Sequence, residues 1–107
     1  MKVHLLSYGG RVVAAFSSRN KLLRSFTIRM QKQKYYQAII DDLKNMLNGI
    51  YRNKCDKKYR GEIKKESLQE MLNMLSGEDY NYGLFTYEEL ILCTDEDYIL
   101  SSVLLDR

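Results

Sequence analysis

Residues 2–17 read KVHLLSYGGRVVAAFS, two apolar runs separated by Gly9 and Gly10. The first run ends at the aromatic Tyr8, and the second returns from Arg11 to Phe16. Glycine supplies the positive φ that a two-residue hairpin turn requires. The stretch therefore predicts an N-terminal β-hairpin, which is the starting point for an α+β fold.

The segment after the hairpin favours a helix at first and then becomes ambiguous. Ser17 or Ser18 offers a helix N-cap, and apolar residues at 22, 23 and 26 have helical spacing. Residues 26, 28 and 30, however, alternate as they would in a strand. Two alternatives remain open: one long helix over 19–51, or a short helix that ends near Arg24 and is followed by a new element.

From residue 33 onward the pattern is amphipathic. A set of apolar side chains falls within an arc of about 120° on a helical wheel. This set consists of Tyr36, Ile39, Ile40, Leu43, Met46, Leu47 and Ile50. The pattern predicts a helix that ends near Tyr51.

A further helix is predicted after residue 67. Ser67 and Glu70 have the spacing of a capping box, and Gly77 is placed to end the helix. Its apolar face consists of Leu68, Met71, Leu72, Met74 and Leu75. Such a face is more typical of a core than of a partner groove, although an extra apolar strip would also suit a homodimer.

The C-terminal third begins with a loop at 78–83 and offers two candidate helix starts, at Thr86–Glu89 and at Thr94–Asp97. Residues 98–105 are instead rich in Ile, Leu and Val. We expect a short helix near 86–93 and a strand near 97–105 that lies beside the hairpin. The predicted fold is thus α+β in a single domain, 1–107, with two or three amphipathic helices and a small antiparallel sheet.

Charge is distributed very unevenly along the chain. Residues 1–66 carry 16 basic and 5 acidic side chains, whereas residues 67–107 carry 1 basic and 9 acidic ones. The formal net charge of +3 conceals this asymmetry. Such an arrangement indicates either a charged partner or neutralisation of one part of the fold by another.

The basic side chains suggest a nucleic-acid interface. Those of residues 19–34 are Arg19, Lys21, Arg24, Arg29, Lys32 and Lys34, and on a helix we expect them to spread around the wheel. The cluster at 52–65 is interleaved with Tyr51 and Tyr59. Basic side chains neutralise phosphates, and aromatic rings stack on bases. The alternatives are a solvated loop or an internal match to the acidic tail.

The acidic segment 78–97 suggests a protein interface instead. It is accompanied by Tyr80, Tyr82, Tyr87 and Tyr98, and tyrosine is enriched at protein interfaces. Acidic groups and tyrosine together suit a surface that engages a basic protein patch. The alternative is a polar surface over a core strand.

The candidate catalytic groups are few. His4 is the single histidine, and we expect it to be a partly exposed strand residue. One histidine and two distant cysteines, Cys55 and Cys93, fall short of a zinc site. The Gly9-Gly10 pair lacks the lysine that completes a phosphate-binding loop. The sequence therefore predicts a protein that is not an enzyme and that has no metal and no cofactor.

Neither a membrane span nor a signal peptide is predicted. No apolar stretch approaches about 18 residues, and the initial apolar run is too short for a signal-peptide core. The two cysteines fit a reducing compartment. We expect a cytoplasmic protein.

Residues 2–21 resemble the opening of small phage and bacterial proteins. These begin with a strand, a turn, a second strand that ends in a V-x-A-x-F-S-S pattern, and a helix that carries a lysine, as Val12–Ser18 and Lys21 do here. The resemblance implies an α+β architecture and a phage origin, in which case the protein acts in the host cytoplasm. Such proteins often bind and disable a host machine, such as a nuclease, a restriction or CRISPR effector, or RNA polymerase. No catalytic residue is implied.

These observations lead to two functional hypotheses. The first is a non-enzymatic protein that inhibits or modulates a host protein by stoichiometric contact. Its expected contact residues are Tyr51, Lys57, Lys58, Tyr59, Arg60, Tyr80, Tyr82, Tyr87, Asp95, Glu96 and Asp97. The second is a nucleic-acid-binding regulator that uses the basic residues of 19–34 and 52–65.

Overall fold

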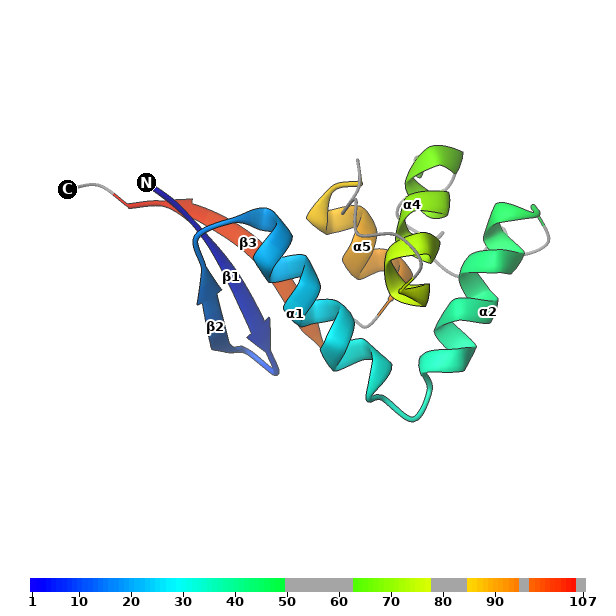
Figure 1. The fold of residues 1–107 in the computed structure, drawn as a ribbon, viewed down its shortest axis with the longest axis horizontal. Helices are drawn as coiled ribbons and strands as arrows, with labels where there is room; N and C mark the ends of the chain where they lie inside the picture. Colours follow the sequence, from blue (N-terminus) through cyan, green and yellow to red (C-terminus); the bar gives the residue numbers. More distant parts are fainter. Residues whose placement is uncertain (50–62, 78–84, 95–96, 106–107) are drawn as a thin grey trace.

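The computed structural model describes residues 1–49, 63–77, 85–94 and 97–105. It confirms an α+β fold with an N-terminal hairpin and a C-terminal strand (Figure 1). The strands are β1 (Lys2–Tyr8), β2 (Arg11–Phe16) and β3 (Tyr98–Leu104), and the helices are α1 (Arg19–Gln31), α2 (Tyr36–Leu47), α4 (Lys65–Ser76) and α5 (Tyr87–Cys93). Within the described ranges, no helix has the length and apolar character needed to cross a membrane.

The sheet is antiparallel, with strand order β2-β1-β3, so β1 is the central strand. Gly9 and Gly10 make the hairpin turn with φ values of +59° and +86°. Positive φ at both turn positions gives the twist that matches the flanking strands. The register of β1 with β2 shifts between Leu6 and Ser7, whereas β1 and β3 pair without interruption.

The two faces of the sheet have different environments. His4 and Leu6 of β1 are buried, as are Tyr98 and Leu100 of β3. Because side chains alternate along a strand, these residues share one face. Helices α1 and α5 pack against the sheet, and α4 lies between α1 and α2 on the far side (Figure 1). The core therefore sits between the inner face of the sheet and the helices.

Helix α1 resolves the ambiguity at residues 26–30, and neither predicted alternative is right. The Ser18 side chain caps its start by accepting from the Lys21 backbone N–H, and the helix continues to Gln31. Phe26 and Met30 are buried one turn apart, while Ile28 between them is 48% exposed. The strand-like alternation at 26, 28 and 30 therefore belongs to a helix: residues 26 and 30 share its buried side, and residue 28 lies on the exposed side. The chain then breaks at 32–35, where the side chains are polar or exposed, before α2 begins.

Helices α2 and α4 pack against each other. Ile39, Ile40 and Leu43 of α2 are buried, and the Tyr36 hydroxyl donates to the Leu75 carbonyl oxygen of α4. Helix α2 ends at Leu47, short of the predicted end near Tyr51, which lies outside the described residues. The apolar face of α4 is in the core, as expected, and is therefore not an open homodimer strip; it comprises Leu68, Met71, Leu72, Met74 and Leu75.

The predicted capping box at Ser67 is wrong, whereas the predicted helix start at Thr86 is confirmed and carries a capping box. Helix α4 begins at Lys65 with Lys64 as its N-cap, so Ser67 lies inside the first turn and is buried. Lys65 and Glu66 are good helix formers and extend the helix ahead of the serine. In α5 the Thr86 hydroxyl accepts from the Glu89 N–H at 3.1 Å, and Glu89 accepts from the Thr86 N–H at 2.8 Å. Gly77 ends α4 with φ +75°, as expected.

We predict that Thr86→Ala lowers the free energy of unfolding by about 1 kcal/mol, because it removes the cap of α5. Ser67→Ala, which removes the same type of S/T-x-x-E pattern, should change it by less than about 0.5 kcal/mol, because this serine is not a cap and Ala favours helix interiors. Urea unfolding of both variants measures the difference. A loss for Ser67→Ala as large as that for Thr86→Ala would contradict this account.

Candidate nucleic-acid interface

Most of the predicted contact residues of the host-protein hypothesis fall on segments that the structure does not describe. The residues at 51–60, Tyr80, Tyr82, Asp95 and Glu96 lie outside the described part of the chain. Tyr87 and Asp97 are described. Asp97 is exposed, and its carbonyl oxygen accepts from the Gly9 N–H at the hairpin turn. The host-protein contact therefore stays a prediction.

Tyr87 and His4 connect α5 to the central strand. A 2.8 Å hydrogen bond joins the Tyr87 hydroxyl and the Nδ1 atom of His4, and the two rings meet edge to face. His4 is 9% exposed, so the expectation of a partly exposed strand residue is wrong. It lies on the inner face of β1, where α5 reaches it. Burial lowers the pKa of His4, and the charges of Lys2 and Arg19 lower it further.

Arg19 packs beside Tyr87 in the same contact region, so it does not contribute to the basic surface. Its guanidinium donates to the Phe85 carbonyl oxygen and lies 5.1 Å from the centre of the Phe85 ring and 5.4 Å from that of Tyr87. Burial raises the pKa of Tyr87 to about 12, although the Arg19 charge opposes part of this rise. Burial also lowers the pKa of Arg19. This cation thus has a structural role at the start of α1.

Of the six basic residues at 19–34, four gather on one side of α1, whereas Arg19 points to α5. Three of the four lie in α1, and the fourth, Lys32, is its C-cap. We define the cationic face as Lys21, Arg24, Arg29 and Lys32. The helical positions of these residues lie opposite the buried positions of α1, which are Leu22, Leu23, Phe26, Thr27 and Met30. Arg19 faces α5, and Lys34 lies two residues past the C-cap and does not line the pocket described below, so neither belongs to this face.

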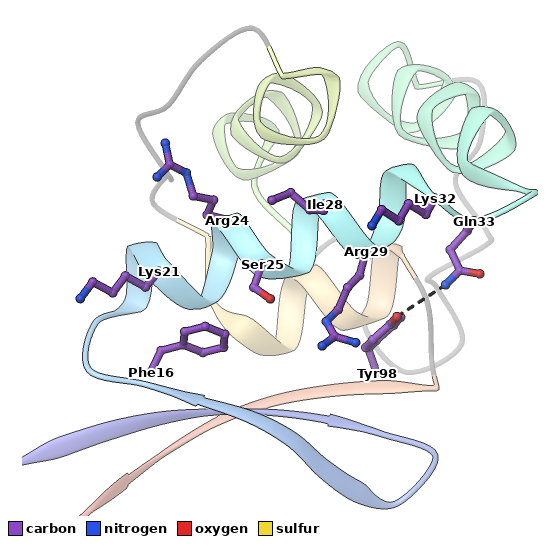
Figure 2. Close-up of a pocket in the computed structure, with 9 residues that line it drawn as sticks. All are labelled: Phe16, Lys21, Arg24, Ser25, Ile28, Arg29, Lys32, Gln33 and Tyr98. Atoms are coloured by element: carbon purple, nitrogen blue, oxygen red, sulfur yellow. Dashed lines mark hydrogen bonds between the residues drawn. The ribbon is translucent and has the colours of Figure 1, made fainter.

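A pocket of about 730 Å³ is lined by the cationic face (Figure 2). Ser25, Ile28 and Gln33 complete its helical side. Figure 2 shows Phe16 and Tyr98 on the sheet side of α1, beneath the two ends of the helix. No carboxylate is present among the described residues that line this pocket. It therefore suits an anionic ligand.

The aromatic side chains of the pocket offer limited stacking surface. Tyr98 is only 4% exposed, since its ring packs against Tyr8 and Phe26. The Nε2 atom of Gln33 donates to the Tyr98 hydroxyl at 3.5 Å. Phe16 is half-buried at the end of β2. The pocket is therefore built for charge and hydrogen bonding more than for stacking on bases.

The described residues offer no group of three or more His, Cys, Asp or Glu side chains that could hold a metal ion. Cys93 is buried in α5, and Cys55 lies outside the described ranges. The signal that sequence reasoning missed is the spacing of the four cations at 21, 24, 29 and 32. It defines one face once α1 is known to extend to Gln31.

Comparisons of the chain with protein-family models, curated proteins and solved structures found no match. The resemblance of residues 2–21 to small phage and bacterial proteins therefore stays a prediction. The candidate interface rests on the geometry of α1 alone.

We predict that the free energy of unfolding decreases as the pH falls from about 7.5 to about 5.5. The unfolded chain protonates His4 near its ordinary pKa of 6.5, whereas the pKa is lowered in the folded protein, so the folded state binds fewer protons at His4 at the same pH. The unfolded state thus binds more protons in this window, and the stability present above pH 6.5 is lost as the pH falls.

The test is urea unfolding across this pH range for the protein and for His4→Gln. The window lies above the ordinary pKa values of Asp and Glu, which limits their contribution. The variant should be less stable at about pH 7.5 but should show a flatter pH dependence. An equally steep dependence in His4→Gln would exclude His4 as its source.

Proposed function

We propose that this chain is a small non-enzymatic protein that binds nucleic acid through the cationic face of α1, by contact with phosphates. The observation that carries the proposal is that Lys21, Arg24, Arg29 and Lys32 line one pocket, with no carboxylate among its described lining residues. Neutralisation of phosphates by Lys and Arg supplies most of the affinity in sequence-independent binding. Two of the four are arginines, whose planar guanidinium groups match phosphate oxygens.

The length of the face fits a nucleic-acid backbone. Lys21 and Lys32 are eleven residues apart, which corresponds to roughly 16 Å along a helix. One strand of a duplex presents about five phosphates over this distance. The four cations span this distance, and Ser25 and Gln33 add polar groups to the same lining.

The same geometry argues for binding that tolerates different sequences. Base readout requires side chains that reach base edges in a groove or rings that are open for stacking. Tyr98 is almost fully buried, and Phe16 is half-buried. We therefore propose a regulator or accessory protein that recognises nucleic acid by charge and shape. It would act in the cytoplasm, which is that of the host cell if the chain is encoded by a phage.

We predict that the triple variant Lys21→Gln, Arg29→Gln, Lys32→Gln binds a labelled single-stranded or duplex oligonucleotide at least about tenfold more weakly at low salt. Removal of three phosphate contacts should also reduce the slope of log affinity against log salt by about two to three. Fluorescence anisotropy over a series of potassium chloride concentrations measures both quantities.

The matched control is Lys2→Gln, Lys44→Gln, Lys65→Gln. It removes the same net charge from exposed positions on β1, α2 and α4 that do not line the pocket. This control should retain most of the affinity and should lose less of the salt slope. Equal losses in both triple variants would indicate a general charge effect, and no binding by the unmodified protein at low salt would refute the proposal.

A further inference from the structure

β3 is an edge strand among the described strands, and its own residues carry none of the charges, prolines or bulges that usually protect such edges. Its seven residues, YILSSVL, include no charge and no proline, and its register with β1 has no bulge. The opposite edge, β2, begins with Arg11 and has a register shift opposite Leu6 and Ser7. Charges and bulges are the means by which native sheets prevent pairing at their edges. β3 therefore stands out as a strand suited to pairing.

The hydrogen bonds at the two ends of β3 show which backbone groups face outward. Leu105 and Met1 exchange N–H···O bonds in both directions, and the Gly9 N–H donates to the Asp97 carbonyl oxygen. In an antiparallel pair, bonded and non-bonded positions alternate. The odd-numbered residues of β3 therefore bond to β1. The N–H and C=O groups of the even-numbered residues, Tyr98, Leu100, Ser102 and Leu104, point away from β1.

We infer that β3 pairs antiparallel with β3 of a second copy of this chain, about a two-fold axis at Ser101. In this register Tyr98 lies opposite the partner's Leu104, and Leu100 lies opposite the partner's Ser102. All four outward-facing residues of each copy then form bonded pairs, and the two sheets become one sheet of six strands. A register shifted by one residue would set bonded positions against non-bonded ones and would leave these groups unpaired.

The side chains of β3 support the same register. Ile99 is 52% exposed and Val103 is 42% exposed on the outer face of the sheet. In the dimer, Ile99 of each copy would lie opposite Val103 of the other. Apolar cross-strand pairs of this kind stabilise sheets. Leu104 is 78% exposed at the end of the sheet that extends beyond the helices (Figure 1). Pairing would place it beside the partner's Tyr98.

Two properties favour a second copy over a foreign strand. The pairing is self-complementary, because the two-fold axis sets the exposed Ile99 of each copy opposite the exposed Val103 of the other. It also sets no like charges against each other, although the chain carries a formal net charge of +3. The paired edge is roughly 23 Å long, so the interface lies at the small end of the known range. We therefore expect a dimer with a dissociation constant in the micromolar range.

The register is tested by a disulfide between two copies of Ser101→Cys, in a Cys55→Ser background. Residue 101 would face itself across a non-bonded antiparallel position, where the Cα atoms are about 4.5 Å apart, within reach of a disulfide. Mild oxidation should give a dimer of twice 12.7 kDa. The matched control, Ser102→Cys, points to the opposite face and is not opposite itself, so it should cross-link much less.

Backbone pairing is tested by sedimentation velocity from low micromolar to near-millimolar concentration, without nucleic acid. Ser102→Pro removes an outward-facing N–H and leaves the bonds to β1 intact, so it should weaken the dimer roughly ten- to hundredfold. Ser102→Ala keeps that N–H and should dimerise as the unmodified protein does. Circular dichroism verifies folding, and Ile99→Lys provides a second disruptive variant if the proline variant does not fold.

Some outcomes would overturn the inference. A monomer at the highest concentration, with no cross-link through residue 101, would exclude the dimer and leave β3 as an edge for a strand of another protein. A dimer that is unaffected by both Ser102→Pro and Ile99→Lys would place the interface elsewhere. Because these measurements contain no nucleic acid, neither result depends on the proposed function.

Discussion

The inner face of β1 is the constraint on which the rest of the domain depends. β1 is hydrogen-bonded on both sides, so it is the strand that unites the sheet. Leu6 is fully buried and His4 nearly so, and both point toward the helices. A shift of β1 by one residue would turn both to the opposite face. The apolar face of a sheet must be buried against another element, so α1 and α5, which cover that face, hold the fold together.

The contact between α5 and β1 also determines on which side of α1 the basic residues lie. Tyr87 bonds to His4, and the Arg19 guanidinium packs on the Phe85 and Tyr87 rings. The contacts of Arg19, the first residue of α1, fix the rotation of this helix about its axis. With Leu22, Leu23 and Phe26 directed into the core, Lys21, Arg24, Arg29 and Lys32 must lie on the opposite side. One packing arrangement thus both stabilises the fold and creates the cationic face.

Local chemistry was predictable from the sequence, whereas properties that depend on packing were not. The Gly9-Gly10 turn, the Gly77 helix end and the Thr86–Glu89 cap each follow from a backbone requirement within a few residues. Ser67 has the same spacing as Thr86 but lies inside a helix, because residues 64–66 extend α4 ahead of it. The burial of His4 and the withdrawal of Arg19 arise from contacts with residues 66 or more positions away. No local pattern contains that information.

The two proposals are independent in their evidence but are connected by geometry. A two-fold axis between paired β3 edges runs perpendicular to the sheet, so the helical layers of both copies lie on the same side of the six-stranded sheet. Both cationic faces then belong to one side of the dimer. Four cations give weak binding at physiological salt, but a nucleic acid held by one copy raises the effective concentration for the second. A weak dimer would therefore bind long nucleic acids more tightly than short ones, because only long ones reach both faces.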